Sequence, residues 1–244
     1  MHREFKRIVP GAKRAVLFVH GINATPRFFD EYAAALPEDI SVHSLLLPGH
    51  GGSVAEFGRH SAAEWEAHVH AALGELRAAH ERVYIMAHSL GTLLTIREAV
   101  RDDTGIAGLL LLCVPLRIWS KPTAWGGKLA KGLCGKASRE ELQTCYGHEV
   151  DVRLWRYIGW IPRYAELFRL SREARRVVQQ VKVPTVVFMA GRDEQVSLRS
   201  ETCMRGNPAI MMNRMPQSTH HLFTPEDKAA VTGALLTMCT KEKV

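Results

Sequence analysis

Four short polar segments of the chain carry side chains that can do nucleophilic chemistry, and each of them follows an apolar run. In chain order they are His20–Asn23, Ala87–Gly91, Gly191–Val196 and Gln217–Phe223. Together they supply a serine, carboxylates and histidines. Acyl transfer by a serine needs this set, because an imidazole takes the proton of the serine hydroxyl and a carboxylate orients the imidazole.

Ser89 is the candidate nucleophile. The apolar run Val83–Met86 leads into Ala87-His88-Ser89-Leu90-Gly91, and a helical pattern begins at once. This is the strand–turn–helix context of the nucleophile elbow, G-x-S-x-G, in which a sharp turn lifts the serine above the sheet. Ala87 replaces the first glycine of the pattern but is still small. The alternative is that Ser89 only caps a helix, a position that serine commonly fills.

The segment His20-Gly21-Ile22-Asn23 directly follows the first predicted strand. Acyl transfer requires N–H donors aimed at the developing oxyanion, one from the residue after the nucleophile and one from an early strand–helix loop. We therefore expect the oxyanion hole to be formed by the backbone amides of Ile22 and Leu90. A common glycine turn at the end of a strand is the alternative.

The candidate acid and base come from two later segments. Asp193 and Glu194 both follow the predicted strand Thr185–Ala190, and we prefer Asp193 because it comes first after the glycine turn and is shorter. Most aspartates in turns are only solvated, which is the alternative. His220 and His221 lie between the last predicted strand and the last helix, where one of them can reach back to the serine as the base.

The elements that must position these residues alternate along the chain. Apolar runs predict strands at Ala15–Val19, Val42–Leu46, Val83–Met86, Leu109–Val114, Val186–Met189 and Ile210–Met212. Helical patterns cover Pro26–Leu36, Ala62–Ala79, Leu90–Val100, Pro162–Val181 and Pro225–Met238. Because most of the strands are apolar throughout, we predict an α/β fold with an open, mostly parallel sheet and helices on both faces. Such a sheet places its chemistry beyond the carboxyl ends of its strands.

The alternation breaks once, after Leu109–Val114. A structureless loop of that length is improbable in a compact domain. We therefore predict a helical cap insertion at residues 116–161 and an α/β core at residues 1–115 and 162–244. The whole net charge of +7 arises near the insertion, since residues 116–176 hold 13 Lys and Arg against 6 Asp and Glu. Four of the five tryptophans also lie there.

This basic, tryptophan-rich segment has three possible meanings. Its tryptophans can pack on the core of a solvated lid, which we favour, or the cap can make transient contact with a lipid surface, since Trp, Lys and Arg favour membrane interfaces. A rim of one sign of charge also suits an anionic ester substrate. A nucleic-acid partner is not expected, because Gly127-Lys128-Leu129-Ala130-Lys131-Gly132 is no phosphate-binding loop and no binding module is recognisable.

Composition excludes other classes. The 244 residues are 46% hydrophobic and 23% charged, which is ordinary globular usage. Five cysteines without a CxxC pair indicate reduced thiols, a cytoplasmic location and no metal module. The basic N-terminus has no apolar stretch behind it, so no signal peptide is expected, and no run approaches the roughly 18 residues of a membrane-spanning helix.

The order serine, acid, histidine, each after its own strand, resembles the α/β-hydrolase superfamily over nearly the whole chain. The matching motifs are His20-Gly21, Leu47-Pro48-Gly49-His50-Gly51, Ala87–Gly91, Gly191–Val196 and Ser218-Thr219-His220. Within that superfamily the chain looks most like bacterial carboxylesterases and monoacylglycerol lipases. The resemblance implies Ser89, Asp193 and His220 as catalytic residues, with His220 rather than His221 because the family histidine follows a Ser-x pair. It gives His50 no catalytic role.

The resemblance also implies an activity: hydrolysis of small carboxylic esters through an acyl-enzyme on Ser89, with no cofactor and no metal. A thioesterase or amidase of the same fold is an alternative, and so is a non-catalytic ligand-binding protein. The chain departs from the family in two places. At most one strand precedes Ala15–Val19, so the N-terminal edge of the sheet is shortened, and the predicted cap matches no familiar member.

Overall fold

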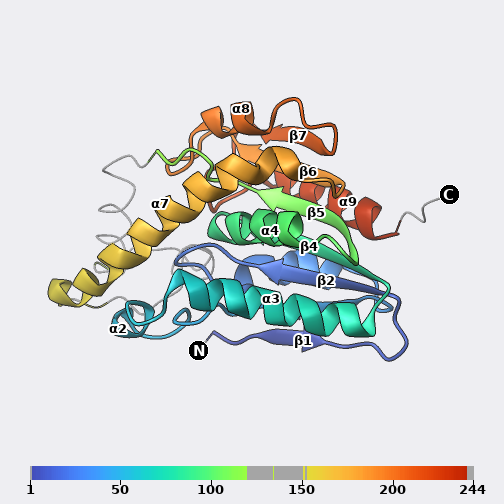
Figure 1. Ribbon diagram of the computed structural model, residues 1–244, viewed down its shortest axis with the longest axis horizontal. Helices are drawn as coiled ribbons and strands as arrows, with labels where there is room; N and C mark the ends of the chain where they lie inside the picture. The colour runs from blue at the N-terminus through green and yellow to red at the C-terminus, as the bar shows by residue number, and fades with distance from the viewer. Residues whose placement is uncertain (1, 120–133, 135–150, 152, 241–244) are drawn as a thin grey trace.

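The structure is a computed structural model, and it describes residues 2–119, 134, 151 and 153–240. Within these residues a seven-stranded sheet has the order β1-β3-β2-β4-β5-β6-β7 (Figure 1). The strands are β1 Phe5–Arg7, β2 Arg14–Val19, β3 Ser41–Ser44, β4 Arg82–His88, β5 Ile106–Leu112, β6 Thr185–Ala190 and β7 Ile210–Met215. Every neighbouring pair is parallel except β1 and β3, which are antiparallel.

Helices follow the strands as the hydrophobic patterns predict. The α-helices are α1 Asp30–Ala35, α2 Val54–Phe57, α3 Ala62–Ala79, α4 Leu90–Arg101, α7 Trp160–Val177, α8 Glu201–Met204 and α9 Pro225–Thr240. The 3₁₀ helices are η1 Pro26–Phe29, η2 Leu154–Gly159, η3 Val178–Gln180 and η4 Leu198–Ser200. Helix α3 begins where expected because Ser61 and Glu64 form a capping box, which satisfies backbone amides of its first turn.

The helices cover both faces of the sheet, so the prediction of a mostly parallel α/β fold is correct. In Figure 1, α3, α4 and α7 cross in front of the sheet, and α9 lies behind it. Each face has its own apolar core. Trp65 of α3, Leu94 of α4 and Leu170 of α7 belong to one cluster, whereas Tyr32 of α1 and Leu235 of α9 belong to the other.

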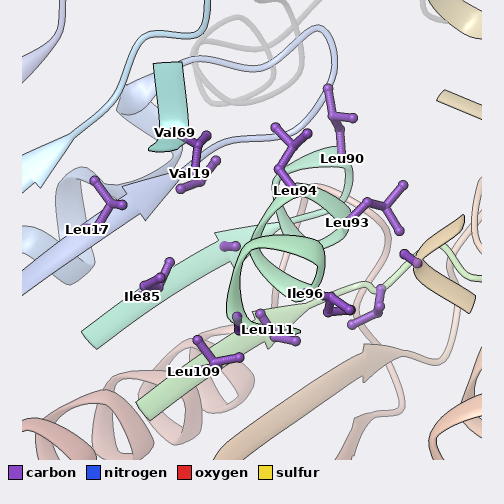
Figure 2. Packing of buried hydrophobic residues seen from close by; sticks show 14 of the residues in the cluster. Leu17, Val19, Val69, Ile85, Leu90, Leu93, Leu94, Ile96, Leu109 and Leu111 are labelled. Carbon is purple, nitrogen blue, oxygen red and sulfur yellow. The ribbon is translucent and has the colours of Figure 1, made fainter. Parts of the chain in front are cut away.

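Leucines dominate the first cluster where α4 packs on the sheet. Figure 2 shows Leu90, Leu93 and Leu94 of α4, which belong to the same buried cluster as Ile85 of β4 and Leu109 of β5. All five side chains are at most 2% exposed. This packing fixes the helix that begins immediately after Ser89.

Most of the predicted insertion, residues 116–161, lies outside the described residues, so the cap remains a prediction. The described residues at its start run beside the loop that follows β6: Ile118 bridges Val196, and the Trp119 amide donates to the Gln195 carbonyl at 2.8 Å. At its end lies η2, and α7 begins at Trp160, two residues before the predicted start. None of the described helices is both long and apolar enough to cross a bilayer.

Candidate active site

Ser89 occupies a strained turn between β4 and α4. Its backbone has φ 50° and ψ −119°, in the positive-φ region that residues other than glycine rarely adopt. Such strain costs on the order of 1–3 kcal/mol and persists only where the surroundings enforce it. Here glycines allow close packing: a Cβ on Gly91 would lie 2.1 Å from the Val19 carbonyl oxygen, and one on Gly21 would lie 2.9 Å from the Ser89 Cβ.

The structure brings Ser89, His220 and Asp193 into one chain of hydrogen bonds. The His220 Nε2 lies 2.9 Å from the Ser89 Oγ, although the two residues are 131 positions apart in sequence. The His220 Nδ1 lies 2.7 Å from the Asp193 Oδ2. Ser89 is 5% exposed, and the His220 and Asp193 side chains are 2% and 1% exposed. Little water therefore competes for these hydrogen bonds.

The surroundings of Asp193 keep its carboxylate charged. The Asp193 Oδ1 accepts hydrogen bonds from the backbone amides of Gln195 at 2.8 Å and Val196 at 2.7 Å. Burial by itself raises the pKa of Asp193, but the attraction to His220, the His220 hydrogen bond and the two amides outweigh it and hold that pKa below its usual value. A charged carboxylate in this position favours the His220 tautomer with its proton on Nδ1.

Glu194 and His221, the sequence neighbours that could have been the acid and the base, make other contacts. The Glu194 carboxylate accepts a hydrogen bond from the His220 backbone amide at 3.2 Å, so it holds the main chain of His220 rather than its ring. The His221 ring packs edge-on against the His220 ring, with centroids 4.7 Å apart. The hydrogen bond to the Ser89 hydroxyl comes from His220.

The two predicted oxyanion donors, Ile22 and Leu90, belong to segments that adjoin Ser89. Leu90 is the first residue of α4, where a backbone amide has no acceptor within its own helix. Ile22 lies in the loop after β2, and the next-door Gly21 packs directly against Ser89. The Ala24 amide closes this loop by donating to the Gly21 carbonyl at 3.2 Å. Leu90 adjoins Ser89 in sequence and the loop of Ile22 packs beside it, so these two amides remain the predicted oxyanion donors.

Two further residues that the sequence analysis did not single out support the site. His88 stacks on Phe28 with ring centroids 4.2 Å apart, and its Nε2 lies 2.8 Å from the His220 carbonyl oxygen, so it donates a hydrogen bond to that carbonyl. Cys113 follows β5 with φ 53° and is fully buried. Burial, and then the nearby Asp193 charge, raise the pKa of its thiol. Their partners lie far away in sequence, so no local pattern indicates these roles.

His88, Cys113 and His220 also form a group whose ligand atoms lie within 4.8 Å of one another. The chemistry of this group does not favour a metal ion. Both ring nitrogens of His220 already contact Asp193 and Ser89, and a thiol with a raised pKa stays protonated, whereas metals bind the thiolate. We interpret the group as hydrogen-bonding support for the serine site.

A serine on a strand–helix turn, linked through histidine to an acid and set on a mostly parallel sheet, is the arrangement of serine hydrolases. A model of the Alpha/beta hydrolase family matches residues 16–237, and the chain belongs to this family. No curated protein sequence is similar enough to this chain to count as a match.

Solved structures show the same fold over nearly the whole chain. One, from work on the metagenome-derived lipolytic enzymes LipS and LipT, has a TM-score of 0.75 at 18% identity and covers 96% of each chain. A monoacylglycerol lipase from Paleococcus ferrophilus has a TM-score of 0.65 at 18% identity, covering 97% of this chain and 98% of its own. A deformylase from Pseudomonas putida S16 has a TM-score of 0.61 at 15% identity, covering 97% and 91%.

Proposed function

We propose that this hydrolase cleaves carboxylic esters through an acyl-enzyme on Ser89. The observation that carries the proposal is the buried chain of hydrogen bonds from Asp193 through His220 to the Ser89 hydroxyl. A protein that only bound a ligand would have no use for a nucleophile held in a strained turn beside a base. This argues against a non-catalytic role.

The first step forms the acyl-enzyme. His220 Nε2 takes the proton of the Ser89 hydroxyl while the Oγ attacks the ester carbonyl carbon, and the carbonyl oxygen becomes an oxyanion held by the Ile22 and Leu90 amides. Asp193 stabilises the charged imidazole. Collapse of the intermediate breaks the C–O bond, and His220 gives its proton to the departing alcohol.

The second step releases the acid. Water takes the place of the alcohol, His220 removes a proton from it, and the resulting hydroxide attacks the acyl carbon. The second tetrahedral intermediate uses the same two amides. The Ser89 Oγ leaves, recovers its proton from His220, and the free enzyme is restored.

For the substrate we propose an ester with a lipid-like acyl chain, with an anionic ester as the alternative. The lipolytic enzymes and the monoacylglycerol lipase of similar fold support a lipid-like substrate. So do the described residues at the two ends of the predicted cap, where Trp119 and Trp155 are 62% and 67% exposed, although Trp160 packs on Phe57. A series of nitrophenyl esters from acetate to laurate, read as kcat/KM, identifies the preferred chain. A parallel series of thioesters and amides tests the alternative activities.

The decisive variants change one group each. Ser89→Ala should lower kcat on a nitrophenyl ester by about 10⁴–10⁶-fold, and His220→Gln by a similar factor. His221→Gln is the matched control, because the hydrogen bond to the hydroxyl comes from the adjacent ring, and it should retain activity within about tenfold. If Ser89→Ala kept most of the activity, the proposal would be wrong.

A further inference from the structure

We propose that Tyr164 is a positioning residue for the oxyanion hole. Its hydroxyl accepts a hydrogen bond from the Asn23 Nδ2, although the two residues are 141 positions apart. Asn23 directly follows Ile22, the proposed oxyanion donor. The inference rests on the proposed function, and it assigns a role to α7, the helix that follows the predicted cap.

The loop of Ile22 needs an anchor. Asn23 has φ 57°, in the left-handed region that asparagine enters more readily than other residues with a side chain but still at some cost. The Ala24 amide closes the turn on the Gly21 carbonyl with a long hydrogen bond of 3.2 Å. The side-chain amide of Asn23 offers a second attachment. It ties the backbone immediately after Ile22 to Tyr164.

Helix α7 is a rigid anchor because contacts on both sides of Tyr164 fix it to the core. The Trp160 Nε1 donates to the Val54 carbonyl at 2.8 Å. The Glu166 carboxylate accepts from the Ala62 amide at 3.0 Å, and the Ser171 hydroxyl donates to the Pro115 carbonyl at 2.6 Å. Tyr164 therefore cannot follow a displaced loop without breaking several hydrogen bonds.

The Tyr164 hydroxyl suits an acceptor role. Burial raises the pKa of this phenol above its usual value, so it is neutral near pH 7. A neutral phenol oxygen accepts a hydrogen bond from an amide and carries no negative charge that would repel the developing oxyanion. Removing that oxygen leaves the Ile22 amide in place but less well aimed, so the expected loss is smaller than the roughly 10²–10³-fold that deleting an oxyanion donor causes.

The test compares two single-atom deletions. Tyr164→Phe removes the hydroxyl that accepts from Asn23, whereas the matched control Tyr157→Phe removes a hydroxyl that accepts from the Asp151 amide at 3.1 Å. Tyr164→Phe should lower kcat on a nitrophenyl ester by about ten- to a hundredfold, with KM within about twofold and no change in the pH profile. Tyr157→Phe should behave as the wild type.

A double-mutant cycle isolates the hydrogen bond. Asn23→Gly deletes the side chain and still permits the positive φ, so it should match Tyr164→Phe, and the double variant should be no slower than either single variant. Losses that multiply would show that the two residues act independently and would overturn the proposal.

Hydrogen exchange supplies a readout that needs no activity. Deuterium uptake by the peptide that contains Ile22 should be faster in Tyr164→Phe than in the wild type or in Tyr157→Phe. Equal uptake in all three proteins would overturn the positioning role. If the wild-type protein hydrolyses no ester and yet the exchange difference is present, the proposed function fails while the structural inference stands.

Discussion

Replacing Asp193 by asparagine changes one atom of the proposed catalytic residues and tests the assignment of the acid. In the wild type, the Asp193 Oδ1 accepts two backbone amides and the Oδ2 faces the His220 Nδ1 at 2.7 Å. In the variant, the carboxamide oxygen of the new side chain must keep the two amide donors. Its NH₂ group then faces Nδ1, and it forces that nitrogen to accept rather than donate.

This reversal places the histidine proton on Nε2, 2.9 Å from the Ser89 Oγ, where a base is needed. The wrong tautomer lowers kcat by about 10⁴-fold in serine hydrolases, which corresponds to about 5.4 kcal/mol at about 1.36 kcal/mol for each factor of ten. We therefore expect a loss of this size for Asp193→Asn, with little change in KM.

The assay is steady-state hydrolysis of a nitrophenyl ester, with the melting temperature measured to confirm folding. Glu194→Gln is the matched control, because the Glu194 carboxylate accepts from the backbone amide of His220, at 3.2 Å, whereas the ring of His220 is held by Asp193. It should lose less than about tenfold. A loss below tenfold for Asp193→Asn, or an equal loss for Glu194→Gln, refutes the assignment of the acid.

Two further predictions concern stability, measured as the free energy of unfolding in urea. Gly91→Ala should destabilise the fold by about 3 kcal/mol or more, because the new Cβ would lie 2.1 Å from the Val19 carbonyl oxygen. Gly74→Ala in α3 is the control: its new Cβ would have no atom within 4 Å, and the change should stabilise the fold by about 0.5–1 kcal/mol. The opposite order would contradict the close packing at the elbow. Burial holds the pKa of His20 well below its usual value, so as the pH falls His20 is protonated in the unfolded chain before it is protonated in the folded protein. The free energy of unfolding should therefore fall as the pH drops below about 6.5, by up to about 1.4 kcal/mol per pH unit. His20→Gln should remove that part of the slope, and an unchanged slope would contradict it.

The sequence predicts the strands and helices well where a local hydrophobic pattern determines them. Apolar runs such as Leu109–Val114 mark strands buried on both faces, and the helical pattern Ala62–Ala79 has the same bounds as α3. Strand β1, Phe5–Arg7, is harder to predict, because its three residues form a strand only by pairing with β3.

In the candidate site, too, some features can be predicted from local sequence and others arise only on folding. The positions of Ser89, Asp193 and His220 after strands β4, β6 and β7 are visible in the sequence, and parallel strands bring their carboxyl ends to one edge of the sheet. The link between Asn23 and Tyr164 is not visible, since it depends on where α7 crosses a loop 141 residues earlier. The same holds for Cys113, whose positive φ and contact with Asp193 arise only in the folded chain.

The central claim is that Ser89 is an activated nucleophile, and covalent labelling tests it without knowledge of the substrate. The protein is treated with a fluorophosphonate, which reacts with activated serines, and the modified residue is located by peptide mass spectrometry. We expect a single stoichiometric adduct on Ser89, much slower labelling of His220→Gln and no adduct on Ser89→Ala. A folded wild-type protein that stays unlabelled, or carries its adduct on another residue, would contradict the claim.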